Sequence, residues 1–444
     1  MQNDQKEFSG EWWNGFLESS QNLTKATSVS NAFSSETSDR MLRNTLNVFK
    51  SFDERAVFRI WVDGKQRDDL NDVLRKNPPQ KNDSLESWTN RIFGQQKFGI
   101  IFNECECWNE ELNIDLYNKI RPLLEKAGYP TMGVDITVFI GNYGWTPLGI
   151  HIDFIGESVM HFHLGPAVKE MYLWDKEVYI NEMKGKLGEN RAEFFVDKAK
   201  KYTIEKGSVF FMPWGMPHIG KSDQLSVGIS LWFNKPTKQK LAATISNNIN
   251  LEYVINGKSF LNQHDSFIHN SKETETIDYQ KDPLSDLYPE LSAGFKREDL
   301  LATLSFVDLF KMGTIDYQYS LKSSLSYSKP LIDAKDRKTI EITEDSDVSL
   351  YAPYKIVWYH SQISGKLHLF IKGQKLMMNY SEDIIELIDR LNMFKLYKAG
   401  DLLEGIFVTS PRELAYRILE VFYENSGLHI TNTVKPSLMY QNNE

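Results

Sequence analysis

The sequence has 444 residues, and its 51 Lys and Arg against 60 Asp and Glu give a formal net charge of −9. At about 150 residues per domain, this length predicts two to four domains. The net acidity argues against broad, sequence-independent binding to nucleic acid, which requires a basic surface. Because no stretch approaches the roughly 18–20 consecutive apolar residues that span a bilayer, we expect no membrane segment.

The cysteine content and the N-terminus bear on the cell compartment. The two cysteines, Cys105 and Cys107, exclude a disulfide framework. A Cys-x-Cys pair can bind soft metals, but without a second pair the simpler interpretation is two buried or incidental thiols. The first residues, MQNDQKE, lack the apolar core of a signal peptide. We therefore expect a cytoplasmic protein.

The N-terminal third predicts two buried strands and one long helix. Residues 56–62 (AVFRIWV) read as a strand that ends at an Asp-Gly turn, and residues 98–102 (FGIIF) as a compact buried strand. Residues 112–127 have helical spacing of leucines and isoleucines and stop before Gly128. Pro122 lies inside that pattern, so we expect it to kink or divide the helix.

Residues 134–233 have a different texture, with short strands separated by turns. The predicted strands are DITVFIG, SVMHFHLG, KEMYLWD, SVFFMPW and LSVGISLWF, each rich in β-branched or aromatic residues. The one helical pattern among them covers residues 181–201. Short strands at this spacing favour a β-sandwich or barrel over a parallel α/β sheet.

The C-terminal half predicts a mixed region followed by a separate unit. Residues 289–310 have the most helical pattern of the mixed region, and the Ser/Tyr/Lys-rich residues 320–329 resemble a linker. Two strands and three helical patterns follow, which together suggest a two-stranded wing with several short helices. The strands are residues 355–358 and 367–371, and the helical patterns are residues 380–391, 402–407 and 411–423.

The most informative segment is Gly149-Ile-His151-Ile-Asp153. Alternate residues of a strand point to the same face, so His151 and Asp153 can present an imidazole and a carboxylate side by side. His218 follows a strand and a Pro/Gly turn and can supply a third ligand. Two His and one carboxylate form the facial triad of non-haem Fe(II) oxygenases, which leaves three positions open for a bidentate cosubstrate and dioxygen. The alternative is a strand histidine that merely hydrogen-bonds a neighbour.

Three segments resemble the JmjC and cupin-type 2-oxoglutarate oxygenases, particularly the ribosomal-oxygenase branch: TPLGIHID, LGPAVKEMYLW and KGSVFFMPWGMPHIG. The resemblance is strongest over residues 95–235. It implies a mainly β core, the double-stranded β-helix or cupin/JmjC jelly roll with helical additions. It also implies that His151, Asp153 and His218 are the catalytic Fe(II) ligands.

The resemblance extends more loosely to the C-terminus. SGKLHLFIKGQKLMM followed by EDIIELIDRL is similar to the winged-helix tail of the ribosomal-oxygenase branch. It implies a catalytic domain with an N-terminal extension in residues 1–235, a helical connecting and dimerisation region in residues 236–335, and a winged-helix-like domain in residues 336–444. A peptide-recognition wing has much the same sequence pattern.

The resemblance also implies a cation for the distal carboxylate of 2-oxoglutarate. Lys169 is the first choice, although its spacing to Trp174 is looser than the family's Gly-x-Lys-x-Trp pattern, and a surface lysine is the alternative. Thr146 and Tyr143 are further candidates for the same pocket. His161 and His163 form a second His-x-His pair, and we expect one to line the pocket and the other to meet a polar partner rather than to bind metal.

Other common chemistries lack their motifs, since there is no dinucleotide fingerprint, Walker loop, nucleophile elbow or His-Glu-x-x-His. We therefore expect an enzyme that uses Fe(II), 2-oxoglutarate and O2 to hydroxylate a side chain of a peptide or protein, with a homodimer suggested by analogy. Three alternatives stay open: a small-molecule hydroxylase of the same fold, a 2-oxoglutarate-independent metal cupin enzyme, and a non-catalytic JmjC-like peptide-binding protein.

Overall fold

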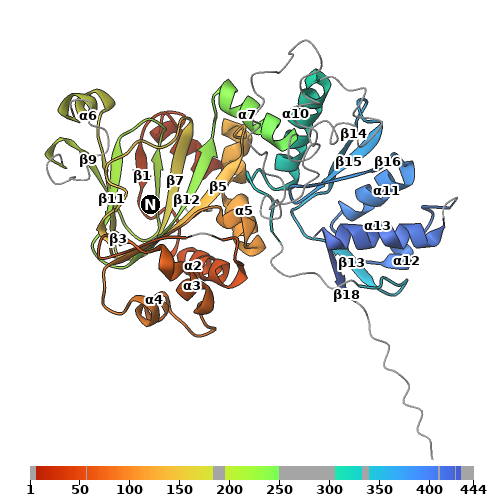
Figure 1. The fold of residues 1–444 in the computed structure, drawn as a ribbon, viewed down its shortest axis with the longest axis horizontal. Helices are drawn as coiled ribbons and strands as arrows, with labels where there is room; N and C mark the ends of the chain where they lie inside the picture. The colour runs from red at the N-terminus through yellow and green to blue at the C-terminus, as the bar shows by residue number, and fades with distance from the viewer. Residues whose placement is uncertain are drawn as a thin grey trace, which may run out of the picture.

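The structure is a computed structural model that describes residues 7–56, 58–183, 196–249, 306–332, 340–408, 411–425 and 427–431. Figure 1 shows a β-rich body formed by the N-terminal part of the chain and a smaller body formed by the C-terminal part. The helices α7 (Lys238–Ile249) and α10 (Phe306–Ser323) lie between the two bodies. Within the described residues, no helix is both long enough and apolar enough to cross a bilayer.

Eight strands of the N-terminal body alternate between two facing antiparallel sheets. In chain order, the first, third, sixth and eighth strands lie in the larger sheet, and the other four form the smaller sheet. This alternation is the topology of a double-stranded β-helix, so the prediction of a mainly β core is confirmed. The strands are β5 (Val134–Gly141), β6 (Gly144–Trp145), β7 (Glu157–Pro166), β8 (Lys169–Leu173), β9 (Lys200–Ile204), β10 (Ser208–Met212), β11 (His218–Ser222) and β12 (Ser226–Asn234).

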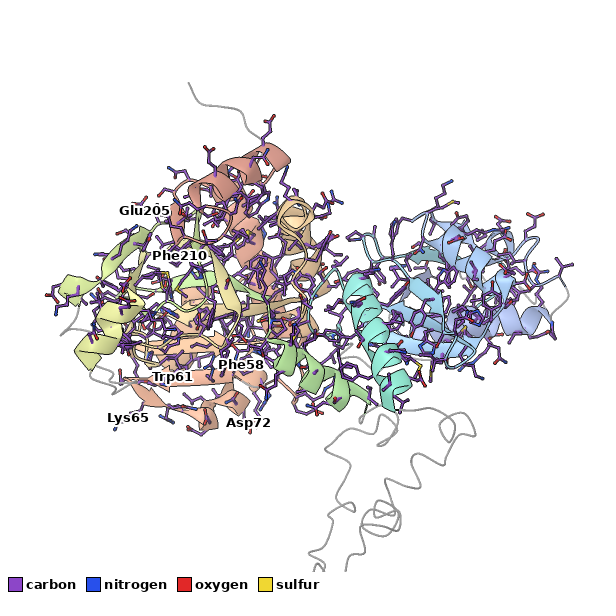
Figure 2. The ribbon with its side chains drawn as sticks, turned by 90° about the horizontal axis from the view of Figure 1, so that it is seen from above. Phe58, Trp61, Lys65, Asp72, Glu205 and Phe210 are labelled. Atoms are coloured by element: carbon purple, nitrogen blue, oxygen red, sulfur yellow. The ribbon has the colours of Figure 1, made fainter. Side chains whose placement is uncertain are left out.

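Strands from the N-terminal extension widen the larger sheet on both sides. Its order is β1-β10-β7-β12-β5-β4-β2-β3, so β4 pairs with β5 and β2 pairs with β4. Phe58 on β2 is fully buried, and Phe210 on β10 lines a central cavity (both are labelled in Figure 2). The added strands are β1 (Thr27–Val29), β2 (Phe58–Val62), β3 (Lys65–Gln66) and β4 (Phe98–Phe102).

The two faces of the larger sheet have different chemistry because side chains alternate along each strand. On β7, Met160, Phe162 and Leu164 pack into the main hydrophobic core with α2 and α5. The intervening residues Val159 and His161 line the cavity on the opposite face. The helices of this body are α1 (Gly10–Ser19), α2 (Ser35–Ser51), α3 (Asn71–Lys76), α4 (Leu85–Phe93), α5 (Glu110–Ala127) and α6 (Lys176–Met183).

Two sequence predictions in this body need correction. Helix α5 runs through Pro122 without division, because Leu116, Ile120 and Leu123 on its buried face pack into the core and outweigh the lost backbone hydrogen bond. The helix predicted for residues 181–201 is wrong at its end, where Lys200 and Lys201 belong to strand β9. Residues 184–195 of that prediction lie outside the described part of the chain.

The predicted linker at residues 320–329 is also wrong. Helix α10 continues to Ser323, and the residues after it turn back against the barrel, where Ser324 and Tyr327 are buried. Tyr327 Oη donates a hydrogen bond to the carbonyl of Asn113, and Val134 N–H donates one to the carbonyl of Ser326. Polar composition suggested a solvated segment, but tertiary hydrogen bonds bury it. Residues 289–305 of another predicted helix, residues 289–310, lie outside the described part of the chain.

The C-terminal body contains two three-stranded sheets, β17-β13-β18 and β14-β15-β16, and three helices around its own core. The helix predicted for residues 402–407 is displaced, since α12 ends at Leu402 and turns follow. The winged-helix assignment and the domain boundaries at 235 and 335 stay predictions. The elements are β13 (Asp347–Leu350), β14 (Val357–His360), β15 (Lys366–Ile371), β16 (Gln374–Asn379), β17 (Tyr397–Lys398), β18 (Leu428–Thr431), α11 (Glu382–Leu391), α12 (Ala399–Leu402) and α13 (Arg412–Glu424).

Candidate metal centre and its cavity

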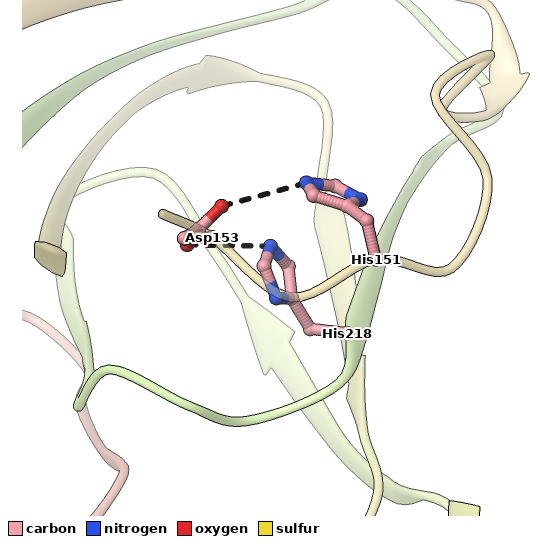
Figure 3. Close-up of side chains that lie close together, drawn as sticks. All are labelled: His151, Asp153 and His218. Atoms are coloured by element: carbon pink, nitrogen blue, oxygen red, sulfur yellow. Dashed lines mark ion pairs between the residues drawn. The ribbon is translucent and has the colours of Figure 1, made fainter. Parts of the chain in front are cut away.

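Backbone pairing places the two candidate histidines side by side. His151 and His218 form an isolated antiparallel bridge in which each N–H donates to the other's carbonyl, at 3.1 and 2.9 Å. Directly opposed residues of an antiparallel pair point to the same face. The imidazole ring centroids are accordingly 4.4 Å apart, and Asp153 faces both rings (Figure 3).

The two imidazoles are oriented so that Nε2 faces Asp153. His151 Nδ1 lies 2.9 Å from the carbonyl oxygen of Gly149, and His218 Nδ1 lies 3.0 Å from that of Met216. A carbonyl can only accept, so each Nδ1 carries the proton and each Nε2 lone pair is free. Hydrogen bonds of this kind set the tautomer and the ring orientation of metal-binding histidines.

The spacing of the ligand atoms leaves room between them. Asp153 Oδ1 is 3.5 Å from His151 Nε2, and Oδ2 is 3.8 Å from His218 Nε2. One ligand atom from each side chain can be chosen so that all lie within 4.8 Å of one another. Asp153 Oδ2 is buried without a hydrogen-bond partner. An orphaned carboxylate oxygen facing two free imidazole nitrogens fits the donor set of a divalent transition metal.

The protonation of the histidines follows from burial and from Asp153. Burial lowers the pKa of His218, and the opposing effect of the Asp153 carboxylate does not overcome it. Burial also lowers the pKa of His151, but the nearby Asp153 carboxylate and the hydrogen bond with the Gly149 carbonyl outweigh burial and raise the pKa overall. His218 is therefore held in the neutral form that a metal requires.

The three side chains line a cavity of about 490 Å³ between the two sheets. Apolar side chains from both sheets form much of its wall. The apolar lining consists of Phe139, Leu148, Ile152, Phe154, Val159, Met171, Phe210 and Met212. Phe154, next to Asp153, is also 79% exposed. A volume of this size, with a few polar groups set among apolar side chains, is typical of a small-molecule or side-chain site.

The three residues expected near the cosubstrate lie together. Lys169 and Thr146 line the cavity, and Lys169 is only 6% exposed, so it is not a surface lysine. Lys169 Nζ donates a hydrogen bond to Tyr143 Oη at 2.8 Å, while Thr146 Oγ1 donates to the carbonyl of Gly220 at 2.8 Å. Burial raises the pKa of Tyr143, but the Lys169 charge and hydrogen bonds outweigh it, and the pKa is lowered overall.

The two histidines of the second pair have different surroundings, as expected. His161 lines the cavity, with Nδ1 at 2.9 Å from Ser230 Oγ and Nε2 buried without a partner. His163 Nε2 instead lies 2.7 Å from the carbonyl oxygen of Ala167. Burial lowers the pKa of both imidazoles, which are therefore neutral at pH 7. Among the described residues, neither belongs to a group of three potential ligands.

A polar row on the cavity wall was not singled out from the sequence. Trp232 Nε1 donates to Thr137 Oγ1 at 2.9 Å, and the Thr137 hydroxyl donates to Asn103 Oδ1 at 3.2 Å. Arg59 Nη2 donates to the same oxygen at 3.3 Å. All four residues line the cavity. The available signal was Arg59 itself, a single charge inside the otherwise apolar strand sequence AVFRIWV.

The two cysteines lie outside this site. Cys105 and Cys107 are free and buried, and Cys105 Sγ donates to the carbonyl of Phe102. Burial raises the pKa of both thiols. The interpretation as buried thiols therefore fits, and among the described residues they belong to no metal-like cluster.

Comparisons with known proteins show similarity of fold. No family model and no curated protein matches the sequence. The structure of YcfD, a ribosomal oxygenase from Escherichia coli, is similar over 95% of this chain and 98% of that chain, with 13% identity and a TM-score of 0.47. Its complex with cobalt and 2-oxoglutarate covers the same shares with 13% identity and a TM-score of 0.45.

A third solved structure covers less of the chain. It is the non-haem alpha-ketoglutarate-dependent carbocyclase SnoK from nogalamycin biosynthesis, similar over 49% of this chain and 82% of that chain, with 10% identity and a TM-score of 0.33. At such low identities, the chemistry of this chain has to be argued from its own side chains.

Proposed function

We propose that this protein is an Fe(II)- and 2-oxoglutarate-dependent oxygenase that hydroxylates a side chain of a peptide or protein. One observation carries the proposal: the triad of His151, Asp153 and His218 shares one cavity with Lys169, a buried cation without a carboxylate partner among the described residues. A metal-binding cupin that uses no acidic cosubstrate has no need of a buried lysine there.

The triad supplies the metal site. The imidazoles of His151 and His218 and the carboxylate of Asp153 would hold Fe(II), as this ligand set does in non-haem oxygenases. The Nδ1 hydrogen bonds of His151 and His218 fix the rings before a metal arrives, which lowers the cost of ordering the ligands. Bound Fe(II), together with 2-oxoglutarate and O2, supplies the oxidation that places oxygen on a substrate C–H bond.

Lys169 supplies the positive end of the cosubstrate site. Its ammonium group is held by Tyr143 and lies beside the Phe139 ring, at 5.3 Å from the ring centroid. A buried ammonium group in an apolar wall binds a carboxylate strongly, because water does not compete for it. Thr146 contributes a hydroxyl to the same wall. The apolar lining excludes water from the space between Lys169 and the metal ligands.

The proposal includes four predictions made from the sequence. They are a peptide or protein substrate, a winged-helix fold for residues 336–444, a homodimer and a cytoplasmic location. A small-molecule hydroxylase of the same fold is the alternative, and product analysis distinguishes the two. The exposed Phe154 beside Asp153 favours a substrate that extends beyond the cavity.

Product analysis tests the proposal. Purified protein with Fe(II), ascorbate, 2-oxoglutarate and O2 is incubated with a peptide library and, separately, with a pool of free amino acids and small acids. We expect succinate formation and a mass gain of one oxygen atom in a peptide. Hydroxylation confined to the small-molecule pool would assign the alternative, and succinate that forms equally in Asp153→Asn would refute the metal site.

A further inference from the structure

Arg59 on strand β2 is a charged residue of the cavity wall that the proposed chemistry does not use. It is half-buried, and its Nε is buried without a hydrogen-bond partner. Its described hydrogen bond is the 3.3 Å contact of Nη2 with Asn103 Oδ1, a neutral acceptor, and no described carboxylate forms an ion pair with it. Arg59 lines the same cavity as His151, Asp153 and His218.

The acidic residues of the same wall have other roles or partners. Asp153 belongs to the metal triad, and Asp135 accepts hydrogen bonds from the neutral side chains of Asn234 and Ser328. Glu157 pairs with Lys240 at 3.1 Å, and Glu104 pairs with Lys329 at 3.6 Å. Along the described cavity wall, Lys169 and Arg59 are the two cations that lack a carboxylate partner.

The guanidinium group is positioned rather than free to turn into solvent. Asn103, which accepts from Arg59, also accepts from Thr137, and Thr137 accepts from Trp232. This row fixes one edge of the guanidinium group and leaves its other N–H groups available. A charge that is partly removed from water without a counter-charge costs free energy. An arginine held in this way is suited to a ligand that brings the missing anion.

We propose that Arg59 binds a carboxylate of the primary substrate and thereby selects acidic substrates. Lys169 takes the cosubstrate carboxylate in the proposed function, on which this inference rests, so Arg59 remains for a second anionic group in the same cavity. The carboxylate can come from an acidic side chain in a peptide or from a free acid, and the two sources are distinguished by experiment.

The test measures binding of four probe pairs to the full-length protein, first without and then with Fe(II) and 2-oxoglutarate under anaerobic conditions. The probes are acetyl-Gly-Asp-Gly-amide and acetyl-Gly-Glu-Gly-amide with their Asn and Gln counterparts, and free acetate and propionate with acetamide and propionamide. Trp232 lines the cavity, so quenching of tryptophan fluorescence reports binding. We expect each bound carboxylate probe to bind about tenfold more tightly than its amide.

Four variants show which residue causes the preference for carboxylates. Arg59→Met should reduce it to less than about twofold, and Arg59→Lys should restore part of it because the charge returns without the planar fork. Arg40→Met is the matched control, since Arg40 lies outside the cavity and pairs with Asp115. In Lys169→Met the preference should persist, because it belongs to Arg59. Thermal melting verifies that each variant is folded.

The outcomes separate this inference from the proposed function. A preference confined to the peptide probes or to the free acids supports the inference and names the source. Equal binding of acids and amides, no binding of any carboxylate probe, or a preference that survives in Arg59→Met would overturn it. Loss of 2-oxoglutarate binding in Arg59→Met would also overturn it and assign Arg59 to the cosubstrate. If no Fe(II)–2-oxoglutarate complex forms, the metal-free titration still reports on Arg59.

Discussion

The chain places histidine beside aspartate in both of its bodies, with opposite results. In the C-terminal body, Asp316 accepts hydrogen bonds from Tyr359, from His368 Nδ1 at 2.8 Å and from Lys375 Nζ at 2.6 Å. His368 Nε2 lies 2.8 Å from Ser364 Oγ. Every polar atom of this cluster that faces inward has a partner, and His368 is fully buried.

The barrel leaves the equivalent atoms without partners. Asp153 Oδ2 accepts no hydrogen bond, and the two Nε2 atoms stand 3.5 and 3.8 Å from the carboxylate rather than at hydrogen-bonding distance. This difference shows that residue types alone do not define a metal site. The Asp316 cluster has hydrogen-bond partners for its polar atoms and joins α10 to strands β14 and β15. The Asp153 cluster has polar atoms without partners in a cavity, where they are available to a ligand.

The largest expected effect is at the Asp153 cluster. Asp153→Asn should abolish detectable Fe(II)-dependent turnover, because it removes the one anionic ligand. Its melting temperature should not fall, since Asp153 Oδ2 loses no hydrogen bond. Metal titration and thermal melting of both proteins give the two readouts. A variant that binds Fe(II) like the wild type would contradict the assignment.

The Asp316 cluster should show the reverse pattern. Asp316→Ala leaves Lys375 and His368 without their buried acceptor, which we expect to cost about 3–5 kcal/mol of unfolding free energy. Urea unfolding measures the loss. Fe(II) binding by the folded fraction should be unchanged, and a parallel loss of metal affinity would show that the two clusters are not independent.

Asp135 is a third case, a buried carboxyl group of the cavity wall whose hydrogen-bond partners are neutral. Burial, with Glu104 and Glu157 nearby, raises its pKa to about 6. A carboxyl whose folded pKa exceeds its unfolded value near 3.8 destabilises the protein as pH rises from about 4 to about 6. Asp135→Asn should therefore gain up to ~3 kcal/mol relative to the wild type between pH 4 and pH 7.

Urea unfolding of the wild type and Asp135→Asn at pH 4, 5.5 and 7 gives this difference directly. The hydrogen bond from Asn234 favours the ionised form of Asp135 and is already included in its raised pKa, so it adds no separate pH dependence. A stability difference that does not vary with pH would mean that Asp135 titrates normally.

The smallest effect concerns the cosubstrate end of the cavity. Lys169→Met should raise the 2-oxoglutarate concentration for half-saturation about 10–100-fold, as expected for loss of a charge-assisted hydrogen bond. Tyr143→Phe removes only the hydroxyl that positions Lys169, so its effect should stay within about tenfold. Titration of the Fe(II) complex measures both, and equal effects of the two variants would argue against a direct role for Lys169.

The sequence predicted the parts of the site that lie close together in the chain. Simple alternation predicted that His151 and Asp153 face the same way, and both do reach the triad, although His151 forms only an isolated bridge and Asp153 lies in a loop. Lys169 was the doubtful choice because its spacing is irregular; the structure places it in the cavity, since β8 begins at this residue. The pairing of His151 with Asp153 rests on local alternation, whereas the choice of Lys169 rests on the resemblance to the oxygenase family.

The parts that sequence reasoning missed depend on distant contacts. Arg59 and Asn103 reach the cavity only because β2 and β4 extend the larger sheet beyond β5. The buried segment around Tyr327 was taken for a linker because its composition is polar, although its polar groups form hydrogen bonds with α5, with β5 and within the segment. Neither feature has a periodic pattern, and each follows from how strands and helices assemble.

The most direct test of the metal and cosubstrate assignment is anaerobic. Fe(II) and 2-oxoglutarate are added to the purified protein, to His218→Ala and to His368→Gln as a control, and the visible metal-to-ligand charge-transfer band is recorded. We predict the band in the wild type and in the control, and its loss in His218→Ala. Absence of the band from the wild type with Fe(II) bound would contradict the account and leave a metal cupin that does not use 2-oxoglutarate.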